Sequence, residues 1–385
     1  MWLINCHELS LEEFNKQNIP AYAILSHTWE SDDEITFANF AQGRSEEKGW
    51  TKIVQSSRLA LEYGFGYVWI DTCCIDKSSS AELTEAINSM YAWYATSRMC
   101  FAYLSDFDGS DGHSSFFSSR WFTRGWTLQE LIAPKVLQFY DSSWNLFGSK
   151  AKLSEDIAYA TGIDAAVLEQ SVSDLEELLD AIPVCRKMSW AASRQTTRIE
   201  DMAYCLLGIF GVNMALIYGE GEEAFIRLQE KIIGKKNDLT ILAWKTEAET
   251  LPWNRFGILA KSPKEFSNSG SIVLSQDLKY NPDFTITNKG IQITVALPIH
   301  MTMEMPILSL HCHHRDKPEE PLGIFLGSIG GGVYGRGSPN VIVVEKAGAR
   351  SSETSIFLSI YKPRVSSKTS IGSALYQGQD FYSKR

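Results

Sequence analysis

The chain lacks the features of membrane-spanning and secreted proteins. It contains no uninterrupted apolar run of about 18 residues, so we expect no membrane-spanning helix. The opening stretch MWLINCHELSLEEF carries acidic residues and no basic cluster, and we therefore expect no signal peptide. The 7 cysteines follow no disulfide or metal-ligand spacing, which indicates free thiols in a reducing compartment. We expect a cytoplasmic protein, in which the adjacent Cys73 and Cys74 are either packed thiols or a redox pair.

Concentrated positive charge is also missing. The chain has 36 Lys and Arg against 46 Asp and Glu, for a net charge of −10, and its one dense basic spot is the pair Lys235 and Lys236. Proteins that bind nucleic acid need clustered Lys and Arg to neutralise phosphates. We therefore expect no nucleic-acid partner.

Common catalytic and metal-binding motifs are absent as well. The sequence has no P-loop, no H-E-x-x-H and no G-x-S-x-G. Gly330, Gly332 and Gly335 have the G-x-G-x-x-G spacing, but a strand pattern follows where a dinucleotide site needs a helix, which favours a hairpin. The stretch LHCHH (310–314) sits in a strand pattern, where adjacent side chains point to opposite faces, so we expect no metal site.

What is present divides into three regions. Residues 1–150 alternate buried strand patterns (22–29, 67–71, 99–104) with helical patterns (48–66, 79–94), which predicts an α/β domain with a parallel sheet and helices on both faces. In residues 151–236 the sequence predicts helices that pack on the α/β domain, one of them over RIEDMAYCLLGIFG, and shows no evident catalytic residues. Residues 237–385 carry short strand-like runs, beginning with LTILAW (239–244), that predict an antiparallel sandwich or barrel. We expect this β-rich region to serve in ligand sensing or autoinhibition.

Polar residues at strand ends are the first candidates for a site. Ser26, His27 and Trp29 end the first predicted strand, and Asp71 and Asp76 follow the second. In an open parallel sheet, ligands bind beyond the carboxyl ends of the strands. His27 is equally typical of a core or capping histidine, and each aspartate is equally typical of a turn cap.

The stretch RWFTRGWTLQELIAP (120–134) places one carboxylate, Glu130, among apolar side chains. Glu130 comes four residues after Trp126, so we expect both on one face of a helix. A buried charge is costly unless it is paired or has a chemical role. Two interpretations remain open at this point: a salt bridge from Glu130 to Arg120 or Arg124, or a reacting group.

Three segments in this order, AYAILSHTW, YVWIDTCCIDK and RWFTRGWTLQELIAP, resemble the fungal heterokaryon incompatibility (HET) domain over about residues 20 to 150. Glu30 departs from the pattern, because glycine is frequent there. Residues 188–233 resemble the segment that follows this domain in many large fungal proteins, where it often leads to a nucleotide-switch domain and repeats. We expect this chain to lack both, so that a trigger would be a separate protein or absent.

The resemblance implies a cell-death effector that acts when genetically different fungal cells fuse. HET domains are considered distant relatives of the Toll/interleukin-1 receptor (TIR) domain, which implies a TIR-like, flavodoxin-like sheet. Enzymatic members of that wider group cleave NAD with a glutamate on the helix after the third strand, and Glu130 matches it by position. The alternatives are a non-enzymatic, self-assembling death-signalling adaptor and a receptor that binds a nucleotide without cleaving it.

The same resemblance sets the expected site. We expect NAD or a related nucleotide as substrate, self-association as the active state, and neither cofactor nor metal. Glu130 would be catalytic. The expected substrate-binding residues are Ser26, His27, Trp29, Asp71, Asp76, Arg124 and Trp126.

Overall fold

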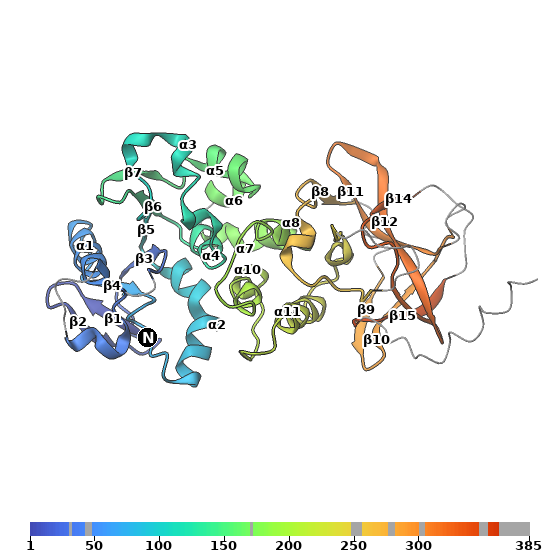
Figure 1. The fold of residues 1–385 in the computed structure, drawn as a ribbon, viewed down its shortest axis with the longest axis horizontal. Coiled ribbons are helices and arrows are strands. Elements are labelled where there is room, and N and C mark those ends of the chain that lie inside the picture. Colours follow the sequence, from blue (N-terminus) through green and yellow to red (C-terminus); the bar gives the residue numbers. More distant parts are fainter. Residues whose placement is uncertain are drawn as a thin grey trace, which may run out of the picture.

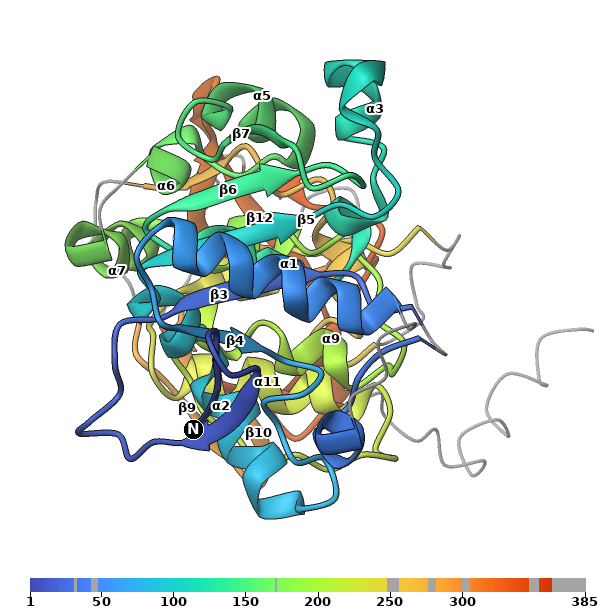
Figure 2. The same ribbon diagram turned by 90° about the vertical axis from the view of Figure 1, so that its left-hand side faces the viewer.

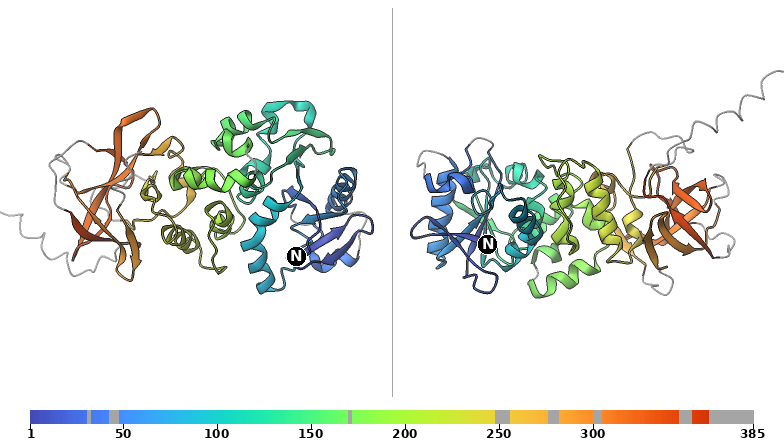
Figure 3. Two further views of the ribbon diagram at one scale, coloured as in Figure 1. Left: turned by 180° about the vertical axis from the view of Figure 1, so that it is seen from behind. Right: turned by 90° about the horizontal axis from the view of Figure 1, so that it is seen from below.

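The computed structural model describes residues 1–30, 33–42, 48–169, 172–247, 256–275, 282–299, 305–345 and 353–361. An α/β region, a helical region and a β-rich region follow one another along the longest axis, in chain order (Figure 1, Figure 3). This is the order that the sequence predicts.

The first region is built on a seven-stranded sheet with the order β2-β1-β4-β3-β5-β6-β7. The strands are β1 (Trp2–Asn5), β2 (Ser10–Glu13), β3 (Ala23–His27), β4 (Tyr67–Ile70), β5 (Met99–Tyr103), β6 (Leu137–Tyr140) and β7 (Leu146–Ser149). The four central strands are parallel, and the outer strands β1, β2 and β7 are antiparallel to their neighbours. The sheet is therefore mixed and not purely parallel, because the short β1–β2 and β6–β7 connections allow only antiparallel pairing.

The parallel core has a chain order that creates a crevice. Counted along the chain, its four strands lie in the order 2-1-3-4, as in flavodoxin-like sheets. Helix α1 (Lys48–Glu62) joins β3 to β4 on one face of the sheet, and α2 (Ser80–Thr96) joins β4 to β5 on the other (Figure 2). The predicted α/β fold with helices on both faces is confirmed. The chain passes from β3 to its neighbour β4 on one side and then crosses to β5 on the other side of β3. The order of the strands therefore reverses at β3, and ligands are expected beyond its carboxyl end.

Short helices follow the third parallel strand, β5. They are η2 (Gly109–Asp111), α3 (His113–Phe116), η3 (Arg120–Thr123) and α4 (Thr127–Ile132). A further short helix, η1 (Phe37–Gln42), lies earlier in the chain, between β3 and α1. All six residues of α4 are buried, because α4 packs against β3 and α2 beneath the helical region. The Trp-to-Glu helix predicted from the sequence is α4, which begins one residue after Trp126.

The helical region contains seven helices among its described residues. They are α5 (Ser154–Thr161), α6 (Ala165–Glu169), α7 (Val172–Ala181), α8 (Val184–Ser189), α9 (Asp201–Tyr204), α10 (Leu207–Phe210) and α11 (Glu223–Ile233). The prediction of one helix over RIEDMAYCLLGIFG is wrong, because the segment divides into α9 and α10. The two halves have different partners, α9 packing on α11 and α10 on α2, so one straight helix would not reach both.

The last region is one curled, mostly antiparallel sheet with the order β8-β11-β12-β13-β15-β10-β9 and β14 paired to β12. Its strands are β8 (Ile272–Leu274), β9 (Phe284–Thr287), β10 (Gly290–Val295), β11 (Ile307–His314), β12 (Lys317–Gly330), β13 (Val333–Arg336), β14 (Val343–Val344) and β15 (Thr354–Leu358), and η5 (Pro263–Phe266) precedes them. Gly330, Gly331 and Gly332 have positive φ in the turn from β12 to β13, so the predicted hairpin is confirmed.

One predicted strand is wrong. LTILAW forms the 3-10 helix η4 (Leu239–Leu242), which packs against α8 and β11. Asp238 caps η4 at the Thr240 N–H, and its other oxygen accepts the Val184 N–H at the start of α8. An apolar run of this length is ambiguous in sequence, and here these caps decide in favour of a turn.

The 7 cysteines are free and buried. Across the described ranges, no helix combines the length and apolar character needed to cross a membrane. In the same ranges, no three His, Cys, Asp or Glu side chains gather as possible metal ligands.

Candidate functional site

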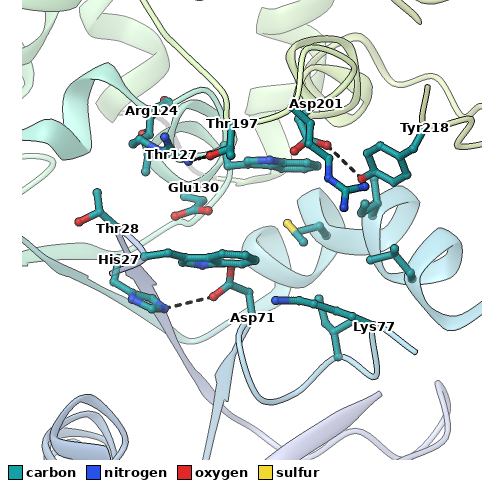
Figure 4. Close-up of a pocket in the computed structure, with 17 residues that line it drawn as sticks. His27, Thr28, Asp71, Lys77, Arg124, Thr127, Glu130, Thr197, Asp201 and Tyr218 are labelled. Atoms are coloured by element: carbon teal, nitrogen blue, oxygen red, sulfur yellow. Dashed lines mark hydrogen bonds and ion pairs between the residues drawn. The ribbon is translucent and has the colours of Figure 1, made fainter. Parts of the chain in front are cut away.

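A cavity of about 410 Å³ lies beyond the carboxyl ends of β3 and β4 (Figure 4). Strand ends and α2 line one side of it, with His27, Thr28, Trp29, Asp71, Ile75, Lys77, Leu83, Ile87 and Met90. The segment leading into α4, and the helical region, line the other side with Arg124, Trp126, Thr127, Glu130, Thr197, Arg198, Asp201 and Tyr218. This is the position at which an open parallel sheet binds ligands.

Glu130 reaches this cavity from α4 while remaining 4% exposed. Its Oε2 accepts a hydrogen bond from the Ser26 hydroxyl, whose oxygen in turn accepts the Trp121 indole N–H at 2.7 Å. Burial, together with the nearby negative charge of Asp71, raises the pKa of Glu130 to about 8, although hydrogen bonds from Ser26 and Tyr94 oppose the rise. A pKa of about 8 favours the protonated carboxyl at pH 7.

Buried cations hold α4 at both ends. Lys150 donates to the Leu131 and Ile132 carbonyls at 3.1 and 3.3 Å, where a helix C-terminus favours positive charge. At the other end, Arg194 from the helical region donates to the Arg124 carbonyl and the Thr127 hydroxyl at 2.8 and 2.9 Å. The short helix that carries Glu130 is thus fixed by contacts from outside itself.

His27 is held between a lysine and an aspartate. Its Nδ1 lies 3.1 Å from Lys52 Nζ, and its Nε2 lies 3.2 Å from Asp71 Oδ1. A lysine ammonium can only donate, so Nδ1 is the acceptor and Nε2 carries the proton that His27 donates to Asp71. With both nitrogens engaged, His27 orients Asp71, and its ring has no free nitrogen for a ligand.

Asp71 then holds Trp29. Its second oxygen accepts the Trp29 indole N–H at 2.9 Å, and the Lys77 ammonium lies 3.7 Å from the centre of the Trp29 ring. Burial alone would raise the pKa of Asp71, but the hydrogen bond from His27 and the charge of Lys77 lower it overall. Asp71 is therefore ionised, in contrast to Glu130.

The helical region builds the opposite wall. Asp201 Oδ1 accepts the Tyr218 hydroxyl at 3.0 Å, and the Arg198 guanidinium lies 4.4 Å from the centre of the Tyr218 ring. Burial raises the pKa of Asp201, and hydrogen bonds from Tyr218 and Trp126 partly offset this. Residues 151–236, which the sequence indicates as packing without evident chemistry, thus contribute four side chains to the cavity lining: Thr197, Arg198, Asp201 and Tyr218.

Backbone pairing brings the two regions together at this wall. Gly125 N–H donates to the Gln195 carbonyl at 2.8 Å, and Gln195 N–H donates to the Thr123 carbonyl at 2.7 Å. A Cβ on Gly125 would meet the Thr196 methyl at 2.5 Å, so the approach requires glycine. Arg124 Nη2 reaches the Thr197 hydroxyl at 3.1 Å across the same junction.

Comparison with known proteins finds one matching family and one similar curated protein. Residues 22–115 match the family described as "Heterokaryon incompatibility protein (HET)". The chain carries a HET domain. It is also 45% identical, over 225 residues, to "Vegetative incompatibility protein HET-E-1" of Podospora anserina. That match covers 56% of this chain and 16% of the relative, so the chain spans less than a fifth of that protein's length. No solved structure matches the chain, and the likeness of its HET domain to TIR domains remains a prediction.

The structure sorts the residues predicted for the HET domain site. His27, Trp29, Asp71, Arg124, Trp126 and Glu130 all line the cavity. Ser26 lies behind Glu130, buried between it and Trp121, and does not line the cavity. Asp76 accepts hydrogen bonds from its own turn at Ser78 and is also outside the cavity lining.

The predicted salt bridge from Glu130 to Arg120 or Arg124 is wrong. Arg120 lies 3.4 Å from Asp106, and Arg124 reaches Thr197. The cation whose charge acts on Glu130 is the buried Arg194 of the helical region. Proximity in sequence favoured Arg120 and Arg124, whereas Arg120 contacts Asp106 and Arg124 contacts Thr197.

A further side chain of the HET domain, Thr28, was not predicted. Thr28 is 5% exposed and lines the cavity, and its hydroxyl has no hydrogen-bond partner among the described residues. A buried hydroxyl without a partner is costly, by about 1–3 kcal/mol. Its place in the motif LSHTW, two residues after Ser26, was the only sequence signal that pointed to it.

Proposed function

We propose that this chain acts in the cytoplasm as an effector of heterokaryon (vegetative) incompatibility, and that its cavity hydrolyses NAD to nicotinamide and ADP-ribose on self-association. The HET domain and the name of the Podospora anserina relative support the first part. The surroundings of Glu130 support the second. Its carboxyl lines a cavity at 4% exposure and, within the described part of the chain, forms no ion pair with a basic side chain.

The proposed reaction needs one carboxylate. The bond between the nicotinamide nitrogen and C1 of the ribose breaks, water adds to C1, and the proton of that water leaves to solvent. The sugar passes through an oxocarbenium-like transition state, as in glycoside hydrolysis. Glycosidases use a second carboxylic acid to protonate the leaving oxygen, but nicotinamide leaves as a neutral pyridine. A single negative charge facing C1 is therefore enough.

The apolar surroundings of Glu130 strengthen its effect on that transition state. Two unit charges 4 Å apart attract by about 1 kcal/mol in water and about 4 kcal/mol at an effective dielectric of 20. Ile75, Leu83, Ile87 and Met90 supply an apolar wall to the same cavity. This accounts for a carboxylate within the apolar stretch RWFTRGWTLQELIAP.

The other charges of the cavity suit the rest of the substrate. Lys77, Arg124 and Arg198 provide positive charge for a diphosphate, and Asp71 provides an acceptor for ribose hydroxyls. The positively charged nicotinamide ring favours the ionised form of Glu130 on binding, which lowers its pKa from about 8.

The test is nicotinamide release by the purified full chain, concentrated with a crowding agent to favour assembly. Glu130→Gln should retain the fold and lower turnover by at least roughly 10²-fold, as loss of one major electrostatic stabiliser does. The matched control is Glu62→Gln, an exposed acid of α1 whose substitution should leave turnover unchanged. Equal turnover in wild type and Glu130→Gln removes Glu130 from catalysis. Cell death with undiminished NAD would instead assign the non-enzymatic adaptor role.

A further inference from the structure

Two aspartates lie beside two tryptophans on opposite sides of the cavity. Asp71 accepts the Trp29 indole N–H at 2.9 Å. Asp201 lines the cavity together with Trp126, whose indole N–H is the donor that opposes the rise in the pKa of Asp201. Figure 4 shows Asp71 and Asp201 on opposite sides of Glu130. One pair comes from the ends of β3 and β4, and the other joins the start of α4 to α9.

Each aspartate is itself fixed by a second donor. His27 Nε2 lies 3.2 Å from Asp71, and the Tyr218 hydroxyl lies 3.0 Å from Asp201. The Trp29 indole is therefore tethered before any ligand arrives, and the acceptor beside Trp126 is fixed in place, which reduces the ordering cost of binding. Trp29 is 49% exposed, and Lys77 lies over its ring, so the remaining face of the indole is available to a ligand.

We propose that Trp29 and Trp126 form an aromatic clamp that holds the pyridinium ring of a nicotinamide nucleotide, and that Asp71 and Asp201 are the positioning residues that aim the two indoles. Tryptophan is the side chain that best attracts a cation over its ring. The two aspartates add negative charge on both sides, which favours the positively charged nicotinamide ring over neutral adenine. With the ring in this clamp, its bond to ribose lies beside Glu130.

The Thr28 hydroxyl provides independent support. It is buried beside Trp29 in the same cavity and has no partner among the described residues. The carboxamide of nicotinamide carries both a donor and an acceptor that this hydroxyl can bond. The clamp rests on the proposal that a nicotinamide nucleotide enters the cavity, but it does not require that the nucleotide be cleaved.

The test measures affinity by calorimetry on the full chain. The probe for the clamp is carbocyclic nicotinamide mononucleotide, in which CH₂ replaces the ring oxygen, so that no oxocarbenium ion forms and the probe survives. AMP is the second probe, because it has a phosphate and a neutral base. The variants are Trp126→Leu, Trp126→Phe and Asp201→Asn, with Asp180→Asn, an exposed acid of α7, as the matched control.

Loss of a stacked ring should weaken binding of the carbocyclic probe to Trp126→Leu by roughly 5- to 150-fold. Trp126→Phe removes the indole N–H and Asp201→Asn removes the negative charge beside it, and each should weaken binding of the carbocyclic probe by about 2- to 12-fold, the effect of one hydrogen bond. If Asp201 acts through Trp126, the double variant Trp126→Phe with Asp201→Asn should bind the carbocyclic probe no more weakly than the single variant that has the lower affinity. The affinity of each variant for AMP should stay within about twofold of the wild-type affinity. The unfolding temperature of each variant should stay within a few degrees of the wild-type value.

Three results would overturn the clamp: no binding of the carbocyclic probe to wild type, unchanged binding in Trp126→Leu, or an equal loss of AMP binding in a folded variant. The outcome is separable from the proposed hydrolysis. Clamp-dependent binding without nicotinamide release removes the reaction and keeps the clamp. Release that depends on Glu130 but tolerates Trp126→Leu keeps the reaction and removes the clamp.

Discussion

Ser26 donates its hydroxyl proton to Glu130, and its oxygen accepts the Trp121 indole N–H at 2.7 Å. An indole can only donate, so Trp121 leaves the Ser26 proton free to bond the carboxylate. Burial raises the pKa of Glu130, whereas a donor at this position favours the ionised carboxylate and lowers that pKa. The serine of LSHTW is therefore a means of adjusting the charge of the carboxyl on α4.

The first prediction concerns the pH dependence of nicotinamide release. Release requires ionised Glu130, so kcat/KM, which reports the free protein, should increase with pH through the region of its pKa, about 8. Ser26→Ala removes a donor to the carboxylate and should move this rise upward by roughly 1–2 pH units. The measurement is kcat/KM against pH for wild type, Ser26→Ala and the control Ser189→Ala, whose hydroxyl donates to the Arg186 carbonyl in α8. Coincident profiles would mean that another group controls the rate.

The second prediction concerns stability. The pKa of Glu130 is about 8 in the folded chain against a model value of 4.5, so the folded state binds the extra proton between these values. The contribution of this proton to the free energy of unfolding is fully present below pH 4.5 and is lost as pH rises through 8. The loss is on the order of a few kcal/mol. Glu130→Gln cannot ionise and should gain stability relative to wild type between pH 5 and 9, as measured by urea unfolding. A pH-independent difference would show that the carboxyl is not desolvated.

The third prediction concerns His27, which joins Lys52 to Asp71. His27→Ala leaves a buried ammonium and a carboxylate without their shared partner, and should cost about 2–4 kcal/mol in the free energy of unfolding. His7→Ala is the control, because His7 is exposed in the turn after β1. Chemical denaturation of both variants provides the comparison. Equal stability of the two would mean that the Lys52–His27–Asp71 contacts add nothing to the fold.

The fourth prediction tests the junction between the HET domain and the helical region. Gly125→Ala brings a methyl group against the Thr196 methyl at 2.5 Å and should cost about 1–3 kcal/mol. Thr196→Ser removes the opposing methyl and keeps the hydroxyl, which bonds to the Arg198 carbonyl at 2.6 Å. The double variant should therefore recover part of the loss. Gly66→Ala, with nothing within 4 Å of the added carbon, is the control. Unfolding free energies that show no recovery would contradict this account of the junction.

Much of the α/β region could be predicted because its signals are local. The runs AILSH, YVWI and MCFAY are short, apolar and bounded by turns, and each is a strand. Ser79, the first residue of the predicted helical pattern 79–94, caps α2 by accepting the Glu82 N–H. The carboxyl of Glu82, however, accepts the Asp76 N–H and not that of Ser79, because the preceding turn brings Asp76 within reach.

The site could be predicted only in part, for a physical reason. The motif residues at strand ends converge because parallel strands end at one edge, which brings His27 and Asp71 to the cavity, and Glu130 reaches it from α4. Asp201 and Tyr218 lie in short helices and turns whose sequence periodicity indicates packing alone. Nothing local relates them to Trp126, which is more than seventy residues away from Asp201 along the chain.

The sequence by itself determined the strand and helix alternation, the polar strand ends and the carboxylate within an apolar helix, since each depends on neighbours within a few residues. Only the tertiary structure decided which partner Glu130 has, which acid of the cavity is charged, and which segment closes it. Hydrogen bonds and desolvation act over a few ångströms in space, whatever the separation along the chain. The pairing of Gln195 with residues 123–125 is what brings the second wall of the cavity to the first.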